Sequence, residues 1–164
     1  MKLLALVLAL LALVLPRISE AQMVGPEYLV HVGGLPMSCK TSSEVQVAIY
    51  ADYSLDNIGV ARTAPNGAPI IVLNPNVIGR YSPIVKQWWF AHECAHHALG
   101  AWNNETNADC FGAKELVKFG ILNNNSQLQS FVNELANLPG SPESGHLPGF
   151  ERAMKIATCA LGFS

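Results

Sequence analysis

Three ionisable side chains on one short segment have the spacing of a metal site. The segment His92-Glu93-Cys94-Ala95-His96 matches the pattern H-E-x-x-H. Residues four apart lie about 40° apart around a helix, so His92 and His96 project from one face and can bind one metal ion. Glu93 lies about 100° from His92, close enough to reach a water molecule beside the metal rather than the metal itself. The pattern predicts a Zn²⁺ site in which Glu93 acts as the general base.

A second pair of acidic residues follows the histidines after a short connection. Glu105 and Asp109 are four residues apart, so they share one face of the next predicted helix. A catalytic zinc ion takes three protein ligands and keeps one position for water. We expect Glu105, in the first turn, to be the third ligand and Asp109 to fix a ligating histidine by a hydrogen bond. The reverse assignment of Glu105 and Asp109 stays open.

The two motifs together resemble those of the gluzincin metallopeptidases. His92-Glu93-x-x-His96 followed by Glu105-x-x-Ala108-Asp109 is similar to small secreted or periplasmic relatives of the membrane-bound CAAX-protease and heat-shock metallopeptidase family. The segment from His146 to Arg152 is similar to the downstream His-Pro segment of that family, which an Arg follows. The resemblance covers residues 69–159 and implies Glu105 as the third ligand. The chain departs from the family in its short connection between the motifs and in Leu147, which separates His146 from the proline.

The resemblance implies hydrolysis of a peptide bond in a peptide or protein substrate. Glu93 takes a proton from water and passes it to the leaving amine, while zinc polarises the scissile carbonyl. His146 and Arg152 are candidates for stabilising the oxyanion, and an ion pair with Asp109 is the structural alternative for Arg152. The predicted strand 69–73 is expected to bind an extended substrate by edge pairing.

A second function class is a non-catalytic metal-binding or interaction module of the same fold. Glu93 argues against it, because a purely structural zinc site has no use for a general base and is normally closed by four protein ligands. A third class, a disulfide-stabilised binding protein, requires the two motifs to coincide by chance.

The first 21 residues have the pattern of a secretory signal peptide. A basic N-terminus precedes thirteen apolar residues, Leu3 to Leu15, and small residues at Ser19 and Ala21 suit cleavage before Gln22. The apolar run is too short for a membrane span, which needs about 20 residues. We therefore expect a secreted or periplasmic protein that consists of residues 22–164 as one domain. An uncleaved anchor helix is the alternative.

The composition of the remaining chain excludes several partner classes. Removal of residues 1–21 leaves 143 residues with 8 basic and 11 acidic side chains, a net charge of −3 with histidine neutral. The chain lacks the basic surplus that nucleic acids or anionic lipids require, and it contains no second long apolar segment. The many aliphatic residues and few charges indicate a chain that folds around an apolar core.

Strand patterns precede helix patterns along the chain, which predicts an α+β fold. Apolar alternation and short apolar runs predict strands at 27–32, 44–50, 59–62 and 69–73. Asn66-Gly67 predicts a hairpin between the last two strands. Caps, glycine stops and helical spacing predict helices at 83–99, 105–119, 126–137 and 150–161. We expect a small, mainly antiparallel sheet before the helix with both histidines, the second ligand-bearing helix and two further helices.

Four cysteines indicate two disulfides in an oxidising compartment, and three pairings are possible. Cys94 lies on the side of its helix away from the metal histidines, which disfavours a bond to Cys110 on the next helix. If Arg152 pairs with Asp109, Cys110 and Cys159 also approach each other, since each shares a helix with one partner. The favoured disulfides are therefore Cys39–Cys94 and Cys110–Cys159.

The remaining aromatic and histidine residues are assigned structural roles. Trp88 and Trp89 precede the metal histidines by one turn, and we expect them in the core rather than in a substrate cleft. His97 lies too far around the helix from His92 to bind the same metal ion. His31, inside a predicted strand, has no partner motif.

Overall fold

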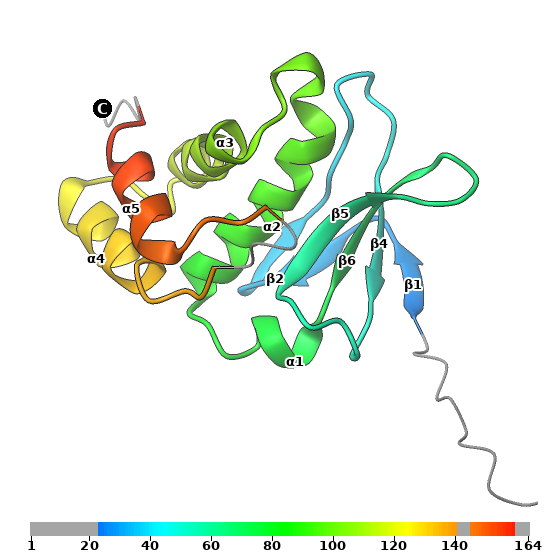
Figure 1. The fold of residues 1–164 in the computed structure, drawn as a ribbon, viewed down its shortest axis with the longest axis horizontal. Helices are drawn as coiled ribbons and strands as arrows, with labels where there is room; N and C mark the ends of the chain where they lie inside the picture. The colour runs from blue at the N-terminus through cyan, green and yellow to red at the C-terminus, as the bar shows by residue number, and fades with distance from the viewer. Residues whose placement is uncertain (1–22, 141–144, 160–164) are drawn as a thin grey trace, which may run out of the picture.

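The computed structural model describes residues 23–140 and 145–159, so the predicted signal peptide lies outside the described residues. The strands are β1 (Val24–Glu27), β2 (Val30–Val32), β3 (Leu35–Met37), β4 (Ala48–Ala51), β5 (Gly59–Thr63) and β6 (Pro69–Leu73). The helices are α1 (Pro75–Ile78), α2 (Pro83–Ala98), α3 (Glu105–Lys118), α4 (Asn125–Leu135) and α5 (Gly149–Ala157), with a 3₁₀ turn at Gly100–Trp102. Helix α2 lies between the sheet and the other long helices (Figure 1). The predicted α+β fold is confirmed.

Four strands form a mixed sheet in the order β1-β4-β6-β5. β6 pairs antiparallel with β5 and parallel with β4, and β1 pairs antiparallel with β4, so the sheet is mainly antiparallel as predicted. β2 and β3 form a separate antiparallel hairpin. β6 is bordered on both sides, which contradicts the expectation that residues 69–73 offer an edge to substrate. The edge strand on this side of the sheet is β5.

The predicted strand 27–32 is wrong, because these residues belong to two strands in two different sheets. β1 ends at Glu27, a bend occupies Tyr28 and Leu29, and β2 begins at Val30. The apolar pattern continues through the bend, so the sequence does not show where the chain changes direction. The strand predicted at 44–50 likewise begins only at Ala48.

The helix boundaries follow the capping residues. The Ser82 hydroxyl accepts a hydrogen bond from Val85 N at the start of α2, and Pro83 occupies the first helical position. Gly100, with a φ of 54°, lets the chain leave α2 in a left-handed conformation. α5 ends at Ala157, and residues 160–161 of the predicted last helix lie outside the described part of the chain. The four-residue helix α1 was not predicted.

Helix α2 is buried on two sides by two apolar clusters. Between α2 and the sheet lie Ile49, Ile71, Leu73 and Phe90 with their neighbours. Between α2 and the other helices lies a second core that contains Trp88 and Trp89, which are 0% and 2% exposed. The expectation that both tryptophans belong to the core is confirmed. Burial on both sides fixes the direction in which α2 presents its polar side chains.

Two disulfides tie the helices to the rest of the fold. Cys39 after β3 bonds to Cys94 in α2, and Cys110 in α3 bonds to Cys159 after α5. These are the two pairs that the sequence favours, and they indicate an oxidising compartment. Across the described ranges, no helix combines the length and apolar character that crossing a membrane requires.

Candidate metal centre

Four side chains that can bind a metal converge where α2, α3 and the segment before α5 meet. His92, His96, Glu105 and His146 each offer one ligand atom, and these atoms lie within 4.8 Å of one another. His92 Nε2 is 3.1 Å from His96 Nε2 and 3.3 Å from Glu105 Oε2. Tetrahedral ligands about 2.0–2.1 Å from a zinc ion are about 3.3–3.4 Å apart. The spacing of these atoms therefore suits a single small cation.

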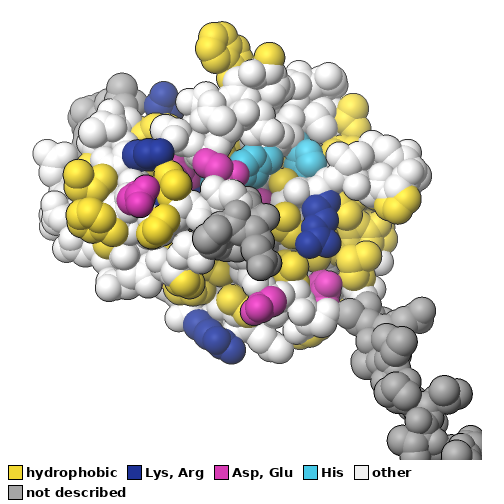
Figure 2. Space-filling model, viewed as in Figure 1, with side chains coloured by type: hydrophobic (Ala, Val, Ile, Leu, Met, Phe, Trp, Pro, Cys, Tyr) yellow, Lys and Arg dark blue, Asp and Glu magenta, His cyan; other side chains and the backbone are white. Residues whose placement is uncertain are grey.

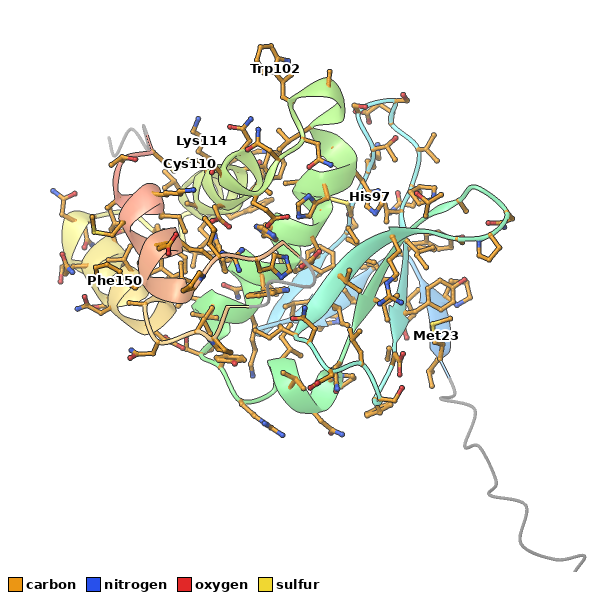
Figure 3. All side chains as sticks on the ribbon, in the orientation of Figure 1. Met23, His97, Trp102, Cys110, Lys114 and Phe150 are labelled. Carbon is orange, nitrogen blue, oxygen red and sulfur yellow. A yellow bond between two sulfur atoms is a disulfide. The ribbon has the colours of Figure 1, made fainter. Side chains whose placement is uncertain are left out.

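The two motifs reach the same point because a short connection reverses the chain after α2. His92 and His96 lie on successive turns of α2, and Glu105 occupies the first turn of α3. The Asn104 side chain caps α3 by accepting a hydrogen bond from Asn107 N at 2.9 Å. Trp102 in the connection is 77% exposed and points away from the molecule (Figure 3).

His92 is held from behind by a buried ion pair. Asp109 Oδ1 lies 2.9 Å from His92 Nδ1, and this contact favours the tautomer that leaves Nε2 unprotonated and able to bind a metal. The Arg152 guanidinium donates to Asp109 Oδ1 at 2.6 Å, and both side chains are 1% exposed. The ion pair predicted between Arg152 and Asp109 is thus present. The position of Asp109 beside Nδ1 favours Glu105 as the third ligand.

Arg152 occupies a closed position in the helical core. Its guanidinium lies 4.6 Å and 4.8 Å from the ring centres of Trp88 and Trp89, where cation–π contact stabilises its charge. Arg152 does not line the cleft beside the metal ligands. This geometry suits the positioning of Asp109 and His92, and not the stabilisation of an oxyanion that the resemblance offered for Arg152.

His96 is oriented by the connection between the two ligand helices. Its Nδ1 lies 2.8 Å from Asn103 Oδ1, which directs Nε2 toward Glu105 Oε1, 3.4 Å away. Asn103 therefore does for His96 what Asp109 does for His92. In the sequence, the pair Asn103-Asn104 indicates only a helix cap. Its place in the short loop between two ligand-bearing helices is the signal that could have identified it.

Glu93 is fixed by the edge strand of the sheet. Its Oε2 accepts a hydrogen bond from Ala61 N in β5 at 2.7 Å, and the residue is 1% exposed. Its Oε1 is buried, makes no hydrogen bond in the described structure, and lies 3.8 Å from His146 Nε2. Glu105 Oε2 is also buried without a hydrogen bond. Two carboxylate oxygens left without donors beside the same histidines fit a site built for a cation and its water.

His146 joins the cluster from a segment distant in sequence. It is 4% exposed, its ring centre lies 5.2 Å from that of Trp89, and its Nε2 is 3.6 Å from Glu105 Oε2. The sequence predicts His146 as an oxyanion donor and does not anticipate it among the possible ligands. An oxyanion donor and a metal ligand would both place His146 Nε2 at the cluster. The resemblance therefore indicates the position of His146 and does not distinguish between these two roles.

The charges of the cluster favour a bound cation. Burial lowers the pKa of His92, but the neighbouring carboxylates of Asp109 and Glu105 outweigh burial and raise it overall. Burial raises the pKa values of Glu105 and Asp109, but their contacts with His92 and neighbouring positive charges lower both overall. Burial lowers the pKa of His146. The carboxylates of Glu105 and Asp109 are therefore ionised at neutral pH. Their negative charges favour a cation at the histidine cluster.

The ligand atoms open onto a surface cleft of about 320 Å³. One wall is residues 60–63 of the edge strand β5, and the other contains His96, Asn103, Glu105 and His146. Figure 2 shows histidine side chains reaching the surface beside acidic ones. His97 also lines this cleft, and its Nε2 contacts Ile70 O at 2.9 Å, which suits the structural role expected for it.

No family model, no curated protein and no solved structure matches the chain. The metal-binding cluster and the fold therefore rest on the residues and geometry of this chain alone.

Proposed function

We propose that this protein is a zinc-dependent peptidase of the gluzincin type. The observation that carries the proposal is the Glu93 carboxylate. One of its oxygens is fixed by β5, and the other is buried without a donor beside the histidine cluster. A carboxylate that only stabilised the fold would use both oxygens, because a buried acceptor without a partner costs about 1–3 kcal/mol.

His92, His96 and Glu105 would hold the ion, with Asp109 and Asn103 orienting the two imidazoles. When bound, zinc supplies polarisation of the scissile carbonyl and acidification of a water molecule. Glu93 Oε1 accepts the proton of that water and delivers it to the leaving amine. His146 Nε2 can donate a hydrogen bond to the oxygen of the tetrahedral intermediate.

The free edge of β5 supplies a binding surface for an extended peptide. The hydrogen bonds Ala64 N to Ala68 O and Asn74 N to Ile58 O show that the even-numbered residues of β5 direct their backbone groups toward β6. The backbone N–H and C=O groups of the odd-numbered residues therefore point toward the cleft, as the hydrogen bond from Ala61 N to Glu93 also indicates. The carbonyl of Ala61 and the backbone of Thr63 can pair with a substrate strand next to the general base.

His146 favours one other function, a metal-binding module without catalysis. If its Nε2 binds the ion, four protein ligands close the site, as in structural zinc sites. Its position within reach of the other ligand atoms is the observation that supports this reading. Glu93 would then have no substrate role.

The test compares the zinc-loaded protein with its Glu93→Gln variant on a peptide library. We expect both proteins to contain about one zinc ion, and the variant to hydrolyse peptides about 10²–10⁴-fold more slowly, the range that a general base contributes. Glu151→Gln, an exposed position in α5, is the matched control and should retain full activity.

Three outcomes decide between the readings. Zinc in both proteins with hydrolysis by the parent alone supports the peptidase. Zinc in both without hydrolysis by either favours the closed four-ligand module. Failure of the parent to bind zinc would overturn both.

Secretion is part of the same proposal. The signal-peptide pattern of residues 1–21 and the two disulfides both support an oxidising compartment outside the cytoplasm. A peptidase that acts there meets peptide or protein substrates.

A further inference from the structure

An arginine of the edge strand lines the cleft beside the metal ligands. Arg62 in β5 is exposed and is the one Lys or Arg among the residues that line this cleft. Within the described residues, its guanidinium makes no hydrogen bond and no ion pair within 4.0 Å, whereas that of Arg152 is held by Asp109. Its pairing with Ile70 puts the Arg62 side chain on the sheet face of Val60 and Ile70, away from α2, where its charge is available to a substrate side chain on that same face.

The register of β5 places Arg62 opposite one defined residue of a bound strand. Its backbone pairs with Ile70 of β6, so its flanking residues Ala61 and Thr63 are the ones that face a substrate strand. A substrate residue opposite Arg62 then forms a non-hydrogen-bonded pair with it. Side chains of such pairs lie closest together in an antiparallel sheet, and opposite charges there stabilise the pairing.

Asp52 is the acidic residue whose charge interacts with Arg62, and it leaves the guanidinium free to bind a ligand. Asp52 interacts with the charge of Arg62 but forms no ion pair with it in the described structure; Asp52 Oδ1 accepts hydrogen bonds from Ser54 N and Ser54 Oγ at 2.8 and 2.7 Å. Glu93 and Glu105, the two acids that line the cleft, lie beside the histidine cluster.

We propose that Arg62 selects extended peptides with Asp or Glu at the position opposite it, close to the scissile bond. The proposal rests on the proposed peptidase function and adds a substrate class to it. The selection comes from cross-strand charge pairing on the edge of β5, and it therefore depends on the charge at residue 62 and on ionic strength.

The experiment uses peptides in which Glu, Gln or Lys is placed in turn at each position around one cleavage site. The proteins are the zinc-loaded parent, Arg62→Glu, and Arg80→Glu as a control with the same charge change away from the cleft. At one position, we expect the parent to cleave the Glu peptide about two- to fivefold faster than the Gln peptide. Arg62→Glu should favour Lys there, and Arg80→Glu should behave like the parent.

Fluorescence anisotropy with the same peptides measures binding in parallel, so that the two proposals fail separately. Binding with an acidic preference that Arg62→Glu reverses, without cleavage by the parent, would keep the role of Arg62 and overturn the peptidase. Cleavage by the parent without any position whose preference depends on residue 62 would overturn the role of Arg62 and keep the peptidase. A preference that Arg80→Glu changes equally, or that persists at high salt, would also overturn it.

Discussion

Each imidazole of the α2 pair is held at its second nitrogen by a different part of the fold. His92 Nδ1 contacts Asp109 in α3, and His96 Nδ1 contacts Asn103 in the connection before α3. Such contacts fix the tautomer and direction of a metal ligand, and their loss costs about 10–100-fold in metal affinity. The two nitrogens that face the cluster are thereby set before any ion binds.

Neighbouring asparagines should affect different properties when replaced by alanine. Asn103→Ala removes the acceptor at His96, so zinc affinity should fall about 10–100-fold with little change in stability. Asn104→Ala removes the α3 cap, so the free energy of unfolding should fall by about 1 kcal/mol with little change in zinc affinity. Zinc competition with a chromophoric chelator and urea unfolding of the metal-free proteins measure the two effects. Equal losses of zinc affinity in both variants would contradict the role given to Asn103.

The sequence identifies the site residues that lie close together on one helix. It misses those that contact the site only through the tertiary fold. The spacing of His92, Glu93 and His96 is a property of one helix, and it can be read without knowing the fold. The partner of Glu93 is the backbone N–H of Ala61 on another strand. A backbone donor has no side-chain signature, so no pattern of residue types could have indicated it.

At the scale of elements, the site depends on how closely α3 approaches α2. Gly112 of α3 lies against Trp88 of α2, and a Cβ at Gly112 would be 2.9 Å from Trp88 Cδ1 and Nε1. Trp88 Nε1 also donates to Asp109 O at 3.2 Å. The glycine thus permits the approach that brings Glu105 to the histidines.

Gly112→Ala should destabilise the protein and weaken zinc binding together. Overpacking a well-filled contact costs about 1–3 kcal/mol, which exceeds the gain in helix propensity of about 1 kcal/mol from replacing glycine. If α3 moves away from Trp88, Glu105 moves away from the histidines with it. Thermal unfolding and zinc competition test this prediction. Lys114→Ala is the control, because the Lys114 side chain on α3 points into solvent (Figure 3). A stabilised variant with unchanged zinc affinity would contradict the close-packing argument.

Strand positions were harder to predict than helix positions, for a physical reason. Helices α2 and α3 begin at Ser82 and Asn104, where side-chain caps mark the first turn in the sequence. The bend between β1 and β2 has no such marker, and the parallel pairing of β4 with β6 joins strands that are not consecutive in the chain. Pairing between distant segments depends on burial, which residue alternation alone does not specify.

At the scale of the whole molecule, the two disulfides join the parts that enclose the site. Cys110 and Cys159 connect α3, which carries Asp109, to the end of α5, which carries Arg152. Cys39 and Cys94 connect the segment after β3 to α2 on the side away from the ligands. The Cys110–Cys159 disulfide therefore supports the ion pair between Arg152 and Asp109, and the Cys39–Cys94 disulfide supports the fold.

Replacing each disulfide by serines should separate these two roles. With sequence separations of 49 and 55 residues, loop-closure entropy predicts a loss of about 4 kcal/mol for either pair. Only Cys110→Ser/Cys159→Ser should also weaken zinc binding, because freeing the end of α5 loosens Arg152 from Asp109 and leaves His92 less firmly oriented. Guanidinium unfolding without zinc and zinc competition on the folded variants give both quantities. A loss of zinc affinity that is as large in Cys39→Ser/Cys94→Ser would show that the metal centre depends on global stability rather than on the link between α3 and α5.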